Sequence, residues 1–205
     1  MIENKKINTS KKIIQKYDLK DFIKFSNEIS INKLNFLKEG IEMNLAIAKE
    51  GLKIENGVGT KFIEMVEEGL MADNVISRAQ ILCSAASEAR MSGSRLPVMS
   101  TAGSGNQGIT AFLTNFVVAE ENNIPEEQLI RCLALTNLIT IFIKSYTRTL
   151  SAMCGSGIAA GTGASAGIVY LLGGNKEQIL GAMRNMVGSI AGIICEEPMK
   201  VALIN

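Results

Sequence analysis

The sequence of 205 residues contains no histidine and no tryptophan. Without histidine, this chain cannot supply a Ser-His-Asp or Cys-His catalytic group or a histidine-ligated zinc site. It also lacks the side chain that most often exchanges protons near neutral pH. Acid–base chemistry is therefore left to carboxylates, lysine, tyrosine and cysteine.

An excess of charge of either sign is also lacking, with 21 Lys+Arg against 20 Asp+Glu and a net charge of +1. Electrostatics thus gives no reason to expect binding to nucleic acid or to an anionic membrane. The N-terminus is polar and has no apolar core of a secretory signal. The four cysteines are far apart, which argues against a disulfide framework. We expect a cytoplasmic, reduced protein in which Cys83 and Cys132 are small buried side chains.

The uncharged run Leu150–Gly174 is long enough to raise the question of a membrane span. It consists mostly of Gly, Ala, Ser and Thr, which lets neighbouring helices approach closely in a membrane or in a tight core. Aromatic belts and a second convincing span are missing. We therefore expect a helix of a soluble core and no membrane partner.

Apolar residues recur at helical spacing nearly throughout, and no alternating strand pattern of useful length occurs. The sequence predicts an all-α protein, a single compact multi-helix domain with Gly/Ala-rich buried helices. Within this continuous domain, residues 1–75 form an amphipathic helical lead-in and residues 76–205 form the core. The expected helices cover residues 18–28, 30–51, 61–70, 72–91, 106–122, 126–146, 149–172 and 176–194.

A short segment of small and amide residues, Gly103–Gln107, lies between the basic loop Arg90–Pro97 and an apolar run. Gly103 and Gly105 let the backbone approach a ligand without a Cβ in the way. A helix that begins at this segment presents unpaired N–H groups and a partial positive charge, which suit a carboxylate or a phosphate. The alternative is an ordinary tight turn and helix cap.

Two of the cysteines lie at expected helix ends. Cys154 begins a small-residue helix, and Cys195 precedes the break at Pro198. A thiolate at a helix terminus beside glycine is a ligand type that suits a soft metal or an iron–sulfur cluster. The alternative is plain burial, and spacing alone does not decide between the two.

Three segments, Ser84–Gly108, Leu150–Gly155 and Gly192–Cys195, resemble the L-cysteine desulfidase family. That family is related to the alpha-type domain of iron–sulfur L-serine dehydratases. The resemblance runs from about Asp21 to Cys195 in matching order and spacing, and GSGNQG is its most specific part. It implies an all-α lyase that uses a [4Fe-4S] cluster, without pyridoxal phosphate, to convert L-cysteine to pyruvate, ammonia and sulfide.

The resemblance also implies roles for individual residues. Cys154 and Cys195 fall on cluster-ligand positions, and an iron left open acts as a Lewis acid on the leaving group. Arg90 is implied as a charged clamp, with a salt bridge to Glu88 or to a neighbouring helix as the alternative. The substrate carboxylate is held by the turn residues, namely Ser104, Gly105, Asn106 and Gln107.

The sequence departs from the family at two places. The N-terminal Gly-Cys-Thr-Glu-Pro motif, whose cysteine is the implied base, does not occur, and neither does the third cluster cysteine after Cys195. We therefore expect a chain that lacks segments at both ends. Such a chain is inactive alone, or active with a partner chain that supplies the missing half, and a homo-oligomer is the other possible assembly. The alternative is an amino-acid-binding or assembly subunit that has lost the cluster.

Overall fold

Helices make up the regular structure of residues 12–147 and 153–193, which the computed structural model describes. No β-strand occurs in these ranges, which confirms the predicted all-α class. The elements in chain order are α2 (Leu19–Glu28), the 3-10 helix η1 (Ile31–Leu34), α3 (Asn35–Gly51), α4 (Val58–Glu67), α5 (Val75–Met91), α6 (Gly105–Glu121), α7 (Glu126–Ser145), the π-helix η2 (Ser156–Gly161), α8 (Thr162–Leu171) and α9 (Lys176–Ile190).

Side-chain caps fix several helix starts. The Asp18 carboxylate accepts hydrogen bonds from the N–H groups of Lys20 and Asp21, at 2.7 and 3.1 Å. The Asp21 carboxylate in turn accepts from the Asp18 N–H, so that unpaired donors of the first turn are satisfied reciprocally. The same arrangement begins α5 at Asn74 and α9 at Asn175. These local signals explain why most predicted helices lie close to their observed positions.

Helix α4 begins earlier than the predicted range 61–70 because a distant carboxylate caps it. The Glu88 Oε2 on α5 accepts a hydrogen bond from the Val58 N–H at 2.7 Å. A negative charge at this point also complements the partial positive charge of the helix start. The cap comes from another helix, so the local sequence pattern does not reveal it.

The single helix predicted over residues 149–172 is wrong in detail. The structure has the π-helix η2 followed by α8, and residues 148–152 lie outside the described ranges. The π-helix consists of small residues and Ile158, and a Cβ on Gly161 would lie 2.5 Å from the Met186 Cε of α9. Close packing against α9 thus accompanies the wider turn, a form of helix that is frequent at functional sites.

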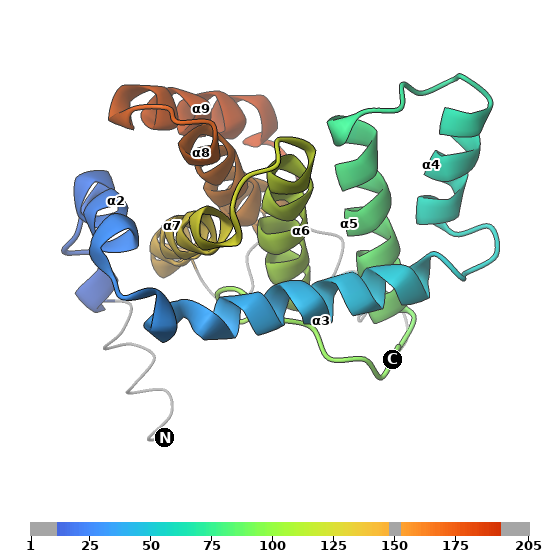
Figure 1. The fold of residues 1–205 in the computed structure, drawn as a ribbon, viewed down its shortest axis with the longest axis horizontal. Helices are drawn as coiled ribbons and strands as arrows, with labels where there is room; N and C mark the ends of the chain where they lie inside the picture. The colour runs from blue at the N-terminus through green and yellow to red at the C-terminus, as the bar shows by residue number, and fades with distance from the viewer. Residues whose placement is uncertain (1–11, 148–152, 194–205) are drawn as a thin grey trace.

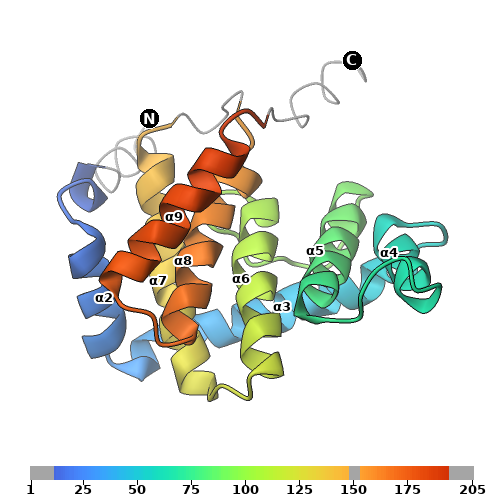
Figure 2. The same cartoon turned by 90° about the horizontal axis from the view of Figure 1, so that it is seen from above.

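The helices form layers around α6. Helix α3 lies along one side of the row α2, α7, α6, α5 and α4, while α8 and α9 pack on the other side of α7 and α6 (Figures 1 and 2). Five apolar residues of α6 are at most 1% exposed, namely Ile109, Ala111, Phe112, Leu113 and Val117. Leu34 and Leu37 from the N-terminal part join the core cluster of Phe112 and Leu133. The division at residue 75 remains a prediction.

Helix α8 packs against a buried polar network at Gly167. The Cys132 Sγ donates to Asn115 Oδ1 at 3.2 Å, and Asn115 Nδ2 donates to Thr136 Oγ1 at 3.3 Å. A Cβ on Gly167 would lie 2.6 Å from Asn115 Oδ1 and 2.9 Å from Cys132 Sγ, and would also collide with Thr136 Oγ1. Cys132 is 0% exposed, as predicted, and the glycine lets the α8 backbone approach it.

Among the described helices, only α7 is long and apolar enough to cross a membrane. Of its most apolar 18-residue stretch, 56% is buried inside the protein, and core helices of soluble proteins meet the same criterion. Its composition is therefore weak evidence for a span. Within the run that raised the question, α8 has 10 residues and buried side chains such as Ala164 and Ala166, as expected of a core helix.

Substituting Gly167→Ala is expected to lower the free energy of unfolding by about 1–3 kcal/mol, because the added methyl group collides with the buried network. Gly181→Ala in α9 is the matched control, since its Cβ would have no heavy atom within 4 Å. This control is expected to gain about 0.5–1 kcal/mol from the helical preference of alanine. Urea unfolding followed by circular dichroism measures both, and equal stabilities would contradict the tight packing of α8.

Candidate functional site

One end of the helical layers brings together the C-termini of α5 and α7, the N-terminus of α6, the start of η2 and the segment after α9 (Figure 2). Arg90 Nη1 donates to Asn106 Oδ1 at 3.0 Å, which joins α5 to α6. The Cys154 N–H donates to the Ile193 carbonyl at 3.0 Å, which joins the start of η2 to the segment after α9. All predicted site residues in the described ranges lie at this end.

The chain enters α6 through a two-residue hairpin turn. Thr101 and Ser104 exchange backbone hydrogen bonds of 3.1 Å in both directions. Between them, Ala102 and Gly103 have φ values of 51° and 82°, the left-handed pair of a type I′ turn. Ser104 then caps α6, its Oγ accepting from the Gln107 N–H at 3.4 Å. The tight turn and the helix cap are thus present. They place the first turn of α6 beside Arg90 and Gly155.

Gly105 and Gly108 let other parts of the chain approach the backbone of α6 closely, and neither has a positive φ. A Cβ on Gly105 would collide with Arg90 Nε and lie 2.8 Å from Val98 Cγ2, so the guanidinium group lies over the first turn of α6. A Cβ on Gly108 would collide with the Met99 carbonyl oxygen. Arg90 Nη1 donates to Asn106 Oδ1 and to Met91 Sδ, whereas the carboxylate of Glu88 caps α4. The Arg90 side chain is therefore directed at the start of α6.

Gln107 meets a residue that the sequence reasoning missed. The Gln107 side chain is 5% exposed, and none of the described residues donates a hydrogen bond to its Oε1. A Cβ on Gly155 would lie 2.7 Å from Gln107 Nε2 and 3.5 Å from Lys144 Nζ. Lys144, in the last turn of α7, is 7% exposed. The absence of a side chain at Gly155 lets these two polar groups lie beside the start of η2.

Cys154 is half-buried, and its Sγ accepts a hydrogen bond from the Gly157 N–H at 3.5 Å. Cys195 lies outside the described residues, although only Ile194 separates it in sequence from Ile193, the backbone partner of Cys154. N–H groups that donate to sulfur are a feature that tunes iron–sulfur clusters. Cys154 is therefore a suitable ligand by its surroundings.

The other two described cysteines lie elsewhere in the fold. Cys132 belongs to the α6–α8 network, and Cys83 Sγ lies 3.7 Å from Thr114 Oγ1. Burial raises the pKa of the Cys83 thiol to about 11 and also raises the pKa of the Cys132 thiol. Both thiols therefore stay protonated at neutral pH, unlike a metal-ligating thiolate.

In the described ranges, no group of three or more His, Cys, Asp or Glu side chains could hold a metal ion. Cys154 is one suitable ligand, and a site-differentiated [4Fe-4S] cluster needs more than one. The described residues alone therefore do not complete the ligand set of such a cluster.

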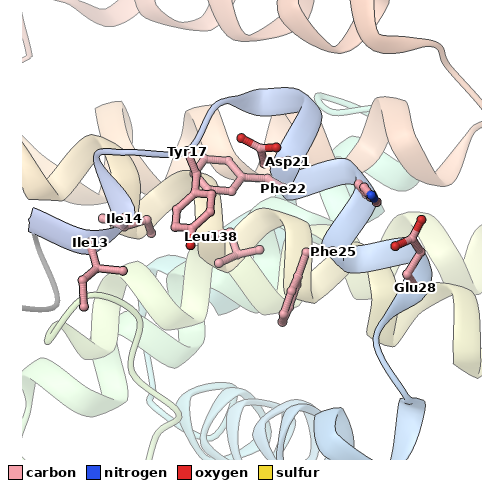
Figure 3. A pocket seen from close by; sticks show the side chains of 9 residues that line it. Ile13, Ile14, Tyr17, Asp21, Phe22, Phe25, Glu28 and Leu138 are labelled. Carbon is pink, nitrogen blue, oxygen red and sulfur yellow. The ribbon is translucent and has the colours of Figure 1, made fainter.

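An apolar groove of about 570 Å³ lies between α2, with the segment before it, and α7 (Figure 3). Its lining includes Ile13, Tyr17, Phe22, Phe25 and Leu138, and none of the predicted site residues contributes to it. Asp21, Lys24 and Glu28 also contribute to the lining, which is otherwise apolar.

Comparisons with known proteins identify the family of this chain. The family described as "Serine dehydratase alpha chain" matches residues 4–201. The chain belongs to this family. Membership confirms the predicted relation to the alpha-type domain of serine dehydratases.

Relatives with similar sequences carry the name "UPF0597 protein". One from Clostridium tetani is 49% identical over 183 residues, which cover 89% of this chain and 42% of the relative. One from Clostridium botulinum is 43% identical over 196 residues, covering 95% and 45%. One from Caldanaerobacter subterraneus is 43% identical over 183 residues, covering 89% and 42%. The chain thus spans less than half the length of these relatives. It matches no solved structure.

The hairpin turn predicts opposite effects at neighbouring positions. Ala102→Asn is expected to stabilise the protein by about 0.5–1 kcal/mol, because asparagine tolerates the left-handed region and favours type I′ turns. Gly103→Ala is expected to destabilise it by about 1–2 kcal/mol, because a Cβ is unfavourable at this φ. Thermal unfolding of both variants checks the turn type, and equal shifts in the same direction would contradict it.

The surroundings of the thiols predict selective alkylation. In a Cys195→Ser background, iodoacetamide at pH 8 is expected to label Cys154 and to spare Cys83 and Cys132. The pKa of Cys83 is raised to about 11, so its thiolate fraction is small at pH 8 and rises only as the pH approaches 11. Mass spectrometry of peptides counts the labels, and a sample unfolded in urea is the control. Native labelling of Cys132 would show that its network is not closed.

Proposed function

We propose that this chain is part of an iron–sulfur lyase of the L-cysteine desulfidase type, a cytoplasmic enzyme of amino-acid catabolism. The reaction is a β-elimination: the α-proton and the sulfur leave L-cysteine, and hydrolysis of the enamine product yields pyruvate and ammonia. The proposal rests on one observation: Arg90, the first turn of α6 and Cys154 all lie at the same end of the helical layers. Membership in the serine dehydratase alpha chain family supports it.

The chain's own residues supply the binding of the carboxylate. Ser104 begins α6, and the partial positive charge of this helix start attracts an anion. The Arg90 guanidinium lies over Gly105 and bonds to Asn106, so a carboxylate at the helix start is within reach of a charged, planar donor. Together these groups orient the amino acid with its carboxylate on the turn.

A bound cluster would supply Lewis-acid chemistry at the departing sulfur. From this chain, Cys154 and, by the resemblance, Cys195 would be ligands. The remaining ligands and the base lie outside the described residues, and the curated relatives are more than twice as long as the matched part. We therefore propose that the chain alone is inactive and acts with a partner chain or a second copy.

A second candidate function is an amino-acid-binding or assembly subunit without a cluster. It is favoured by the sequence, which lacks the third cluster cysteine that the resemblance implies after Cys195. The lyase and the binding subunit would both take a small amino acid as the ligand, whereas an assembly subunit would contact another chain through an apolar surface. Nucleic acid and membranes are partners in neither proposal.

Anaerobic reconstitution of the full chain tests the proposal. Iron and acid-labile sulfide are expected in equal amounts, lost in Cys154→Ala and kept in the matched control Cys83→Ala, whose thiol lies elsewhere. Pyruvate and sulfide from L-cysteine are measured on the same samples, with L-serine as the competing substrate. Absence of bound iron would favour the binding or assembly subunit, and turnover by the isolated chain would contradict the need for a partner.

A further inference from the structure

The thioether of Met91 lies against the side chain of Arg90. Met91 is the last residue of α5, and its Sδ accepts hydrogen bonds from Arg90 Nη1 at 3.3 Å and from Asn106 Nδ2 at 3.6 Å. The same Arg90 Nη1 donates to Asn106 Oδ1 at 3.0 Å, so the three side chains form one closed cluster. A thioether sulfur is a weak acceptor, so Met91 contributes little to holding the guanidinium group.

Oxidants in solution can reach this sulfur. Met91 is 49% exposed, and among the described methionines only Met65, at 38%, and Met153, at 46%, are also exposed. Met65 lies on α4, on the far side of α5 from α6 (Figures 1 and 2). Met65 is therefore a matched control, since it has a comparable exposure but lies away from the candidate site.

Oxidation of Met91 replaces a weak hydrogen-bond acceptor with a strong one. Hydrogen peroxide transfers an oxygen atom to the sulfur: an S–O bond forms, the O–O bond breaks, the sulfur is oxidised and the peroxide is reduced to water. The sulfoxide oxygen is polar, whereas the thioether is apolar. Because Arg90 and Asn106 already donate to this sulfur, the new oxygen lies within reach of both donors. A methionine sulfoxide reductase, which takes its electrons from a dithiol, reverses the step.

We propose that Met91 is a reversible oxidation site through which peroxide controls Arg90. In the reduced chain, Arg90 gives the thioether a weak hydrogen bond, which an anion at the start of α6 can displace. In the oxidised chain, the sulfoxide oxygen is a stronger competitor for the same N–H group. Resting on the proposed function, the consequence is that peroxide weakens the binding of the substrate carboxylate.

Phenylglyoxal, which modifies guanidinium groups, measures the change at Arg90 without any substrate. The reagent needs an uncharged nitrogen, and a strong acceptor stabilises the charged form. After peroxide treatment of the full chain, modification of Arg90 is expected to slow about 10-fold, the effect of a hydrogen bond to a charged group. The rate at the exposed Arg95 is the internal control and is expected to stay the same. Mass spectrometry of peptides follows oxidation and modification at each residue, and treatment with the reductase is expected to restore the Arg90 rate.

Three variants separate Met91 from the other side chains that peroxide can oxidise. Met91→Leu removes the sulfur and keeps every cysteine, and its Arg90 rate is expected to be unaffected by peroxide. Met91→Gln places an amide oxygen near the position of the sulfoxide oxygen, and is expected to slow Arg90 modification without peroxide. Met65→Leu, the matched control, is expected to respond like the unsubstituted chain. Unfolding midpoints, measured for every variant, show whether the fold is kept.

The phenylglyoxal rates decide the inference. An equal loss of Arg90 modification in Met91→Leu and in the unsubstituted chain would overturn the assignment of Met91. An unchanged Arg90 rate after oxidation of Met91 would do the same, and so would a Met91 that stays reduced while Met65 is oxidised.

Calorimetric titration with L-serine tests the consequence for the substrate. Oxidation of Met91 is expected to weaken the affinity about 10-fold. An unchanged affinity would overturn this consequence. If the reduced chain does not bind L-serine, amino-acid recognition by this chain fails and the proposed function fails with it, while the phenylglyoxal rates still decide whether Met91 controls Arg90.

Discussion

The contact between the Met99 carbonyl and Gly108 fixes where helix α6 begins, and the candidate site depends on it. The loop before α6 lies flat on the helix because residue 108 has no side chain. Its position is set from the other side as well, since Asn44 Oδ1 on α3 accepts a hydrogen bond from the Met99 N–H at 2.9 Å. Asn44 is 0% exposed, so this anchor is inside the core. Between Met99 and the start of α6, the chain reverses its direction in the hairpin turn of Thr101–Ser104, and Ser104 then caps the helix.

Much of the fold could be predicted because its signals are local. Asp18 and the apolar stripe after it identify α2, and the small and amide residues around Ser104 identify the start of α6. A capping side chain acts within three residues, and burial repeats with the helical period, so both are visible in a short window of sequence. The resemblance added Arg90 and Cys154, which local signals do not join to one another.

The burial of Lys144 could not be predicted, because it does not arise from a local signal in the sequence. A lysine in the last turn of a helix is ordinarily a solvated cation that complements the helix dipole. Here the start of η2, reached through residues outside the described ranges, packs at Gly155 beside the Lys144 ammonium and removes it from water. The shift of α4 has a similar origin, because Glu88 caps Val58 across a helix pair. Burial and caps that arise between distant segments need the packed structure.

The hydrogen bond from the Cys154 N–H to the Ile193 carbonyl also orders events during translation. Ile193 is the last described residue, so it leaves the ribosome after every helix in this part of the structure has been synthesised. Domains generally assemble as their segments emerge, and α6 and α7 can pack together while this bond has no acceptor. Cys154 is therefore synthesised before the backbone partner of its N–H group exists.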